Sequence, residues 1–231
     1  MDCRRIVTAV LLAASMPAFA GRPLTTEDAS IQEDKACQVE TWIDHSREAT
    51  QGWFVPACNF GANIEWQAGF ARTREDGSSR FSEAYFQAKT LWRPSEEAPW
   101  AVGLVAGVAR KQRETHRGWE NPYVTVPLSV TLESSATTLH FNVGWSQDRA
   151  DGRNATTWGV AAEQAVSPRL TLLTEAFGEN ATRPFIRAGG RYSVIKDRLD
   201  ADLTVVTRPG GTRAERFISL GLFWQTGRFL P

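Results

Sequence analysis

The sequence predicts an all-β protein, a transmembrane antiparallel up-and-down β-barrel of about twelve strands. Three observations lead to this fold class. Apolar and polar side chains alternate over segments of about ten residues, as in half-buried strands. These segments recur at even spacing to the C-terminus, and a short apolar run near the N-terminus has the form of an export signal.

The first twenty residues have the three parts of a secretory signal peptide. Arg4 and Arg5 precede a short apolar run, and Ala18-Phe19-Ala20 forms a small-x-small cleavage site. A membrane anchor is the alternative, but the run is too short to span a bilayer and polar residues follow at once. We therefore expect cleavage before Gly21 and export from the cytoplasm of a Gram-negative cell.

The signal divides the chain into three parts. We expect a signal peptide over 1–20, an N-terminal periplasmic segment over 21–36, and an outer-membrane β-barrel over 37–231. Basic and acidic residues balance at 26 each, so no charge excess indicates nucleic acid as a partner. After residue 20, no apolar stretch is long enough for a membrane helix, which excludes a helical membrane protein.

Two cysteines, Cys37 and Cys58, remain after cleavage removes Cys3. Disulfides form and persist in exported proteins. The two residues flank an expected hairpin loop over 45–51, and an antiparallel register centred there brings them together. Cys37 and Cys58 are therefore candidates for a disulfide, whereas two thiols alone make a poor metal site.

The alternation of side chains locates the strands. It is clearest near residues 64–71, 124–131, 138–145 and 218–225, where apolar side chains occupy every second position. The expected strands begin near Gln38, Gly52, Asn63, Phe81, Trp100, Tyr123, Thr137, Thr156, Leu170, Pro184, Leu199 and Arg216. Their even number agrees with the usual pattern of bacterial barrels.

The connections between these strands differ in length. Short turns alternate with longer, charged connections such as 73–80, 111–121 and 147–154, which we expect at the outer end with both termini in the periplasm. Tryptophans near strand ends are typical of the aromatic girdles at a membrane interface. The tryptophans expected there are Trp53, Trp92, Trp100, Trp145, Trp158 and Trp224.

A soluble β-sandwich is the main alternative, since its strands also bury one apolar face. The length of the strands, the alternation of short and long connections and the even spacing favour the barrel.

Charged residues of the late strands lie opposite the apolar positions and are expected in the barrel interior. They are Glu175, Arg187, Arg191, Asp200 and Asp202, with Glu65, Glu83, Lys89 and Glu163 extending the polar wall. Two interpretations remain open. The charges form a constriction that selects solutes, as charged rings do in pores, or they neutralise one another in a structural network that fills the lumen.

An enzyme is a third class, because some outer-membrane barrels are lipid hydrolases with a serine and a histidine. His140 shares the expected inner face with Thr138 and Asn142, without the His-x-Ser pattern of such an enzyme. We interpret it as an interior histidine. The sequence indicates no catalytic residues, and no cofactor or metal motif is apparent.

The segments 22–29, 38–40, 172–179 and 190–200 resemble those of uncharacterised proteobacterial outer-membrane barrels often labelled transporters or phenol meta-pathway proteins. The resemblance implies a barrel in outer-membrane lipid, inserted by the barrel-insertion machinery, but supplies no catalytic residues. The chain departs from the usual terminal aromatic residue, since Phe229 is followed by Leu230 and Pro231.

These inferences lead to one functional expectation and its alternatives. We expect a monomeric barrel that allows passive or facilitated passage of a small solute. A non-conducting barrel with a structural or surface-interaction role is the second hypothesis, and a lipid hydrolase is the third.

Overall fold

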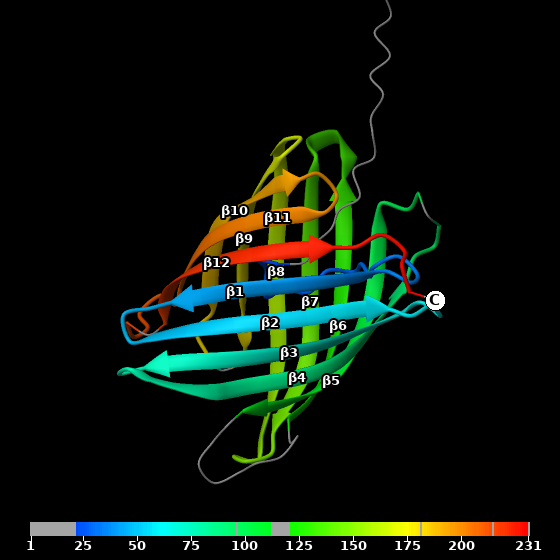
Figure 1. Ribbon diagram of the computed structural model, residues 1–231. Coiled ribbons are helices and arrows are strands. Elements are labelled where there is room, and N and C mark those ends of the chain that lie inside the picture. Colours follow the sequence, from blue (N-terminus) through cyan, green and yellow to red (C-terminus); the bar gives the residue numbers. More distant parts are fainter. Residues whose placement is uncertain (1–21, 96, 112–120, 181, 214, 231) are drawn as a thin grey trace, which may run out of the picture.

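The computed structural model describes residues 22–95, 97–111, 121–180, 182–213 and 215–230, which form one closed antiparallel barrel (Figure 1). The expected signal peptide lies outside these residues. The strands are β1 Cys37–His45, β2 Ala49–Asn59, β3 Ile64–Glu75, β4 Ser78–Trp92, β5 Trp100–Lys111, β6 Asn121–Leu132, β7 Thr137–Asp148, β8 Arg153–Ser167, β9 Leu170–Glu179, β10 Phe185–Ile195, β11 Leu199–Thr207 and β12 Arg216–Gln225. A short 3-10 turn, η1 Glu133–Ser135, follows β6.

The topology is up-and-down. Each strand pairs with the next along the chain, and β1 pairs with β12 from Gln38 opposite Gln225 to His45 opposite Ile218. This last pairing removes both sheet edges. The predicted fold class is confirmed, and every expected strand start lies within three residues of the observed one.

No helix in the part of the chain that the structure describes is long and apolar enough to cross a membrane.

The barrel has two ends, which differ in the chain segments they hold. The terminal end contains the start of β1 and the end of β12, with the connections 60–63, 93–99, 133–136, 168–169 and 196–198. The loop end contains the connections 46–48, 76–77, 149–152, 180–184 and 208–215, together with the link from β5 to β6. Since 93–99 lies at the terminal end, the longer connections do not all share one end.

One expected loop is a tight turn. We expected a long outer connection over 73–80, but β3 and β4 continue through it and leave only Asp76-Gly77 between them. Both residues have positive φ, 46° and 79°, as a two-residue hairpin turn with right-handed twist requires. The Asp-Gly pair is a hairpin signal, so the sequence held the information to place this turn.

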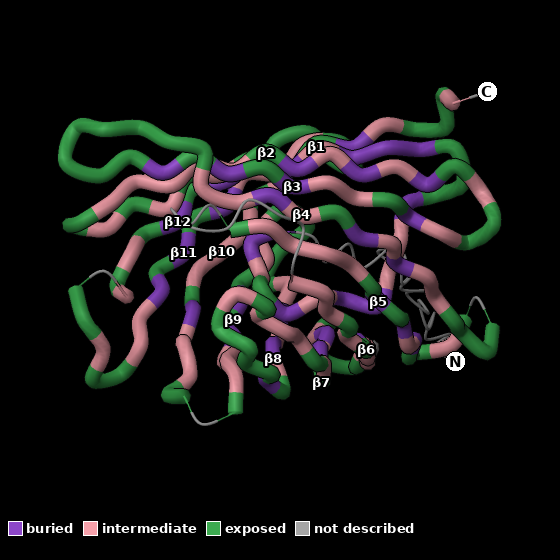
Figure 2. Tube along the Cα trace, turned by 90° about the horizontal axis from the view of Figure 1, so that it is seen from below, coloured by how far each residue is buried: buried purple, intermediate pink, exposed green. Residues whose placement is uncertain are grey.

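The two faces of the wall have opposite character, and Figure 2 shows buried and exposed positions following one another along the strands. Large apolar side chains are exposed on the outside, Leu220 at 58%. They include Ile43, Phe54, Phe70, Phe86, Leu104, Val143, Leu172, Leu203, Val205, Ile218 and Leu222. Polar and charged side chains are buried inside. Apolar surface on this scale is far beyond that of a soluble monomer.

Four of the tryptophans expected in girdles, Trp92, Trp100, Trp145 and Trp224, are exposed. Trp158 is half-buried and lines the lumen, and Trp53 also departs from the expectation. Its ring stacks on that of Trp42 with centroids 5.3 Å apart, and Trp42 lies beneath the Arg22 guanidinium in the lumen. We expected Trp53 in a girdle because it lies near a strand end. The alternation of side chains along the strand instead directs Trp53 inward.

Candidate functional site

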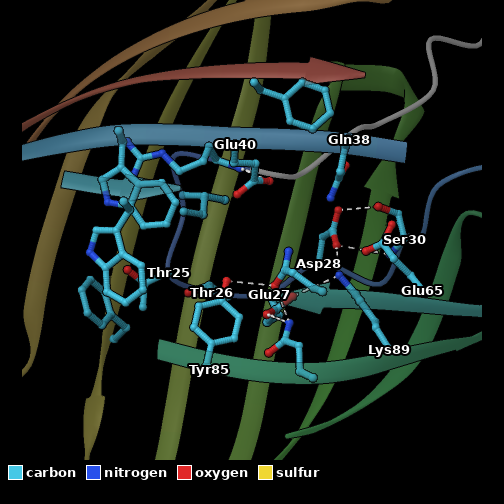
Figure 3. A pocket seen from close by; sticks show the side chains of 18 of the residues that line it. Thr25, Thr26, Glu27, Asp28, Ser30, Gln38, Glu40, Glu65, Tyr85 and Lys89 are labelled. Atoms are coloured by element: carbon cyan, nitrogen blue, oxygen red, sulfur yellow. Dashed lines mark hydrogen bonds and ion pairs between the residues drawn. The ribbon is translucent and has the colours of Figure 1, made fainter. Parts of the chain in front are cut away.

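The lumen contains the chain's own N-terminal segment. Residues 22–36, which we call the lumen segment, run inside the barrel and enter β1 at the terminal end (Figures 1 and 3). Arg22, Thr26, Asp28, Ala29 and Gln32 are buried. The sequence led us to expect this segment in the periplasm. Its described residues instead lie in the lumen that the wall encloses. The inner face of the wall offers the polar partners that the charged side chains of the segment need.

The first anchor of the lumen segment is Arg22. Its Nη2 donates to Asp202 Oδ1 at 3.0 Å and to Ser219 Oγ at 2.8 Å. The backbone N–H of Arg22 donates to Glu40 Oε1 at 3.2 Å. The guanidinium carbon lies 4.3 Å from the centre of the Trp42 ring. One side chain thus joins the segment to β1, β11 and β12.

The second anchor is Glu175 of β9. Its carboxylate accepts the backbone N–H of Thr25 at 2.9 Å and that of Thr26 at 2.8 Å. Arg187 of β10 forms an ion pair with the same carboxylate at 3.2 Å and donates to Thr25 Oγ1 at 3.3 Å. Against β8, a Cβ added to Gly159 would come within 2.5 Å of Thr26 Oγ1. The wall at Gly159 therefore leaves the space that Thr26 occupies.

The third anchor is Lys89 of β4. Its ammonium group forms ion pairs with Glu27, at 3.1 Å, and with Asp28. Gln87 Nε2, one inward position along the strand, donates to Glu27 Oε1 at 3.1 Å. Figure 3 shows Glu27, Asp28 and Lys89 meeting beside Ser30, whose hydroxyl donates to Asp28. Lys89 is buried, so removing its partners would leave an uncompensated charge.

Towards the terminal end the segment contacts β3 and β6. The backbone N–H of Gln32 donates to Glu65 Oε2 at 2.9 Å, and that of Ala29 donates to Ser129 Oγ at 2.8 Å. Backbone pairing with the wall appears at the end of the segment, where the Lys35 N–H donates to the Asn59 carbonyl at 2.7 Å. Residues 25–32 are thus held mainly by wall side chains, unlike the strands of the wall, which pair through their backbones.

The five charged residues predicted on the late strands lie on β9, β10 and β11, and the four that extend the polar wall lie on β3, β4 and β8. Glu175 and Arg187 form one pair, whereas Arg191 contacts Glu163 at 2.7 Å and lies 3.9 Å from Asp200. Asp202 pairs with Arg22 rather than with another strand residue. No local pattern in the sequence pairs the wall with the lumen segment. The charges of Arg22, Glu27 and Asp28 were the available signal, but nothing local identified their partners.

Two cavities flank the lumen segment. One, of about 430 Å³, lies towards β1–β4 and includes Trp42, Trp53 and Tyr85 in its lining. The other, of about 620 Å³, lies towards β5–β9 and reaches Lys111, Asn121 and Arg153 near the loop end. Thr25, Thr26 and Glu27 line both cavities. The segment therefore forms part of the partition between them, together with Tyr123, Phe177 and Phe185 of the wall. Among the described residues, no group of three or more His, Cys, Asp or Glu could hold a metal ion.

His140 lies in the wall beneath the lumen segment. Its Nδ1 is 2.7 Å from Ser129 Oγ, the atom that accepts the Ala29 N–H. The imidazole is only 1% exposed and faces the lumen rather than the apolar outside. A serine and a histidine do meet, but a lipid in the surrounding layer cannot reach them in this arrangement.

A disulfide joins Cys37 and Cys58, which lie opposite each other on β1 and β2. It is at the terminal end, next to the point where the lumen segment becomes β1. The bond fixes the first strand residue to its neighbour and so limits where the preceding segment can go.

Three solved structures with the same fold are two porins and one outer-membrane channel. The KdgM porin is 7% identical, with a TM-score of 0.62 over 82% of this chain and 99% of its own. The NanC porin is 9% identical, with a TM-score of 0.57 over 84% and 100%. An outer-membrane channel from Pseudomonas putida F1 is 10% identical, with a TM-score of 0.57 over 88% and 99%. At these identities the likeness concerns the fold alone.

No curated protein matches the chain. A family model described as "Uncharacterised conserved protein UCP029691" matches residues 8–224, nearly the whole sequence. The description gives no substrate and no pathway. The chain belongs to this uncharacterised conserved family, UCP029691.

Proposed function

We propose that the protein is an outer-membrane channel for a small solute and that its lumen segment keeps the channel closed. The exposed apolar outer face suits lipid, and the polar inner face suits water and solutes. Export by the signal over 1–20 would deliver it to that membrane. Three structural neighbours that are porins or a channel by name support the same proposal.

One observation carries the proposal. Thr25, Thr26 and Glu27 line both cavities, and removing them would open one cavity towards the other without removing a strand. The segment is attached through side chains of β1, β3, β4, β6, β9, β10, β11 and β12. Such contacts can be exchanged for water or for solute, unlike the backbone pairs of the wall.

The lining of the first cavity indicates the kind of solute. Carboxyl groups of Glu27, Asp28, Glu40, Asp44 and Glu65 outnumber the basic groups of Arg22, Lys89 and Arg187. One neighbouring structure is a KdgM porin in complex with oligogalacturonate, a polyanion. Because carboxyl groups exceed basic groups in the cavity of this protein, we propose that its solute is cationic or neutral.

A non-conducting barrel remains the second proposal, and a specific observation favours it. Arg187, Arg191, Lys89 and Arg22 each contact at least one carboxylate, which is typical of a self-compensating network. In that role the segment would be a permanent part of the core.

Planar-bilayer recording separates the two roles. We would compare the full mature chain with a variant lacking 22–32, which keeps the Lys35 and Ala36 pairing to Asn59. The channel proposal expects rare openings of the full chain and sustained conductance of the deletion variant. A deletion variant that folds, as judged by a gel shift on boiling, yet never conducts would contradict it.

A cross-link tests whether the segment moves. Ala29→Cys with Ser129→Cys introduces thiols on two neighbouring residues, since the Ala29 backbone nitrogen now lies 2.8 Å from Ser129 Oγ. The locked protein should not open, and a reductant should restore the openings of the full chain. The unmodified protein treated with reductant controls for loss of the Cys37–Cys58 bond. Openings that persist in the locked protein would show that the segment is not the gate.

A further inference from the structure

The wall contains a formed pocket around the Arg22 guanidinium. Trp42 of β1 lies against one face, and Asp202 of β11 and Ser219 of β12 accept from Nη2. The side chains of Arg22 and Asp202 are 4% and 2% exposed. The pocket residues come from three adjacent strands, which the β1–β12 and β11–β12 pairings hold side by side.

The shape of the pocket matches a planar cation. A Cβ added to Gly221 would come within 2.8 Å of Arg22 Nη2, 2.9 Å of Nε and 2.6 Å of Asp202 Oδ2. A larger residue than glycine would therefore occupy the place of the guanidinium. An aromatic face above the plane and a carboxylate at its edge are what guanidinium groups select.

The occupant belongs to the segment, whereas the pocket belongs to the wall. Glu40, Trp42, Asp202, Ser219 and Gly221 all lie in paired strands and would keep their places if Arg22 left. The emptied pocket would hold the Asp202 carboxylate without the cation that now pairs with it, which is costly for a buried group. Arg22, Glu40 and Trp42 also line the cavity of about 430 Å³, so a solute there is already beside the pocket.

We propose that this pocket is a binding site for guanidinium-bearing solutes and that Arg22 occupies it as a tethered competitor. A free solute of this class displaces Arg22 and so favours release of the lumen segment. The proposal rests on the proposed channel function and names its solute class. Since the competition involves equivalent guanidinium groups, the solute gains the same contacts that Arg22 gives up.

The test uses the full mature chain with Arg22→Ala, which empties the pocket. Isothermal calorimetry in detergent compares L-arginine with L-citrulline, whose neutral urea group replaces the guanidinium at nearly equal size. We expect the variant to bind arginine at least about tenfold more tightly than citrulline, because a charged hydrogen bond to a buried carboxylate is lost with citrulline. Arg22→Ala with Asp202→Asn should lose this preference.

An exposed arginine provides the matched control. Arg153 forms an ion pair with Glu179 at 3.0 Å near the loop end, and its side chain is 56% exposed. Arg153→Ala removes one arginine from a carboxylate without creating a pocket, so it should not generate arginine binding. A folded Arg22→Ala variant that binds neither solute, or both equally, would overturn the proposal.

The calorimetric result is independent of conductance. Arginine binding to Arg22→Ala together with a silent deletion variant would refute the channel and leave the pocket standing. Conductance of the deletion variant without selective arginine binding would refute the pocket and leave the channel standing.

Discussion

Glu175 is the position where the closed lumen can be tested most sharply. Its carboxylate accepts the N–H groups of Thr25 and Thr26 and pairs with Arg187, and the residue is only 2% exposed. Replacing it by alanine leaves two backbone donors and a guanidinium without this acceptor. A charge-assisted hydrogen bond contributes about 1.5–3 kcal/mol, and breaking a buried pair costs about 3–5 kcal/mol.

The Glu175–Arg187 pair lies within the wall, so the docking of the lumen segment depends on the two hydrogen bonds from Thr25 and Thr26. At about 1.5 kcal/mol each, their loss in Glu175→Ala lowers the docking free energy by about 3 kcal/mol. Since about 1.4 kcal/mol corresponds to a factor of ten, the docking equilibrium should fall by about a hundredfold. Hydrogen exchange of the Thr25 and Thr26 amides in a lipid nanodisc measures this equilibrium directly. Glu175→Gln retains a carbonyl acceptor, so the protection of the Thr25 and Thr26 amides should fall by less than in Glu175→Ala.

Glu179 supplies the control on the same strand. It pairs with Arg153 at 3.0 Å, with its side chain 34% exposed, and surface pairs contribute at most about 1 kcal/mol. Glu179→Ala should leave the exchange of Thr25 and Thr26 nearly unchanged. Equal protection in Glu175→Ala and in the unmodified protein would refute the anchoring role of Glu175.

Three further predictions test the wall, the disulfide and the lumen charges. Leu220→Arg places a charge on the outer face of β12 and should cost about 2–4 kcal/mol of unfolding free energy in lipid vesicles, whereas Leu220→Ala should cost less. An unchanged free energy of unfolding for Leu220→Arg in vesicles would mean that this face does not contact lipid. Cys37→Ser with Cys58→Ser opens a 21-residue loop and should lower the free energy of unfolding, measured in urea, by about 3 kcal/mol while the barrel still shows a boiling-dependent gel shift. An unchanged urea midpoint would show that the bond adds nothing to stability. Arg191→Ala in the chain lacking 22–32 removes the cation that contacts Glu163 at 2.7 Å, so the ratio of cation to anion permeability should rise. An unchanged ratio would place Arg191 outside the conducting path.

The sequence by itself determined the strands and their faces. Side chains in a strand alternate with a period of two, so the apolar positions near 218–225 were enough to direct Ser219 inward and Leu220 outward. The same local rule placed Glu175, Arg187, Arg191, Asp200 and Asp202 on the inner face. The candidate pairing of Cys37 with Cys58 was also local, because one hairpin sets its register.

Only the tertiary structure decided what fills the lumen. Residues 22–36 have no strand period, and the contacts of Arg22 with Asp202 and Ser219 span 180 and 197 residues of sequence. These partners come within reach only when β1 pairs with β12 and closes the wall. Burial of charge then requires each group to find an opposite partner inside the barrel. The placement of the lumen segment therefore follows from barrel closure and from charge compensation across it, neither of which a local pattern contains.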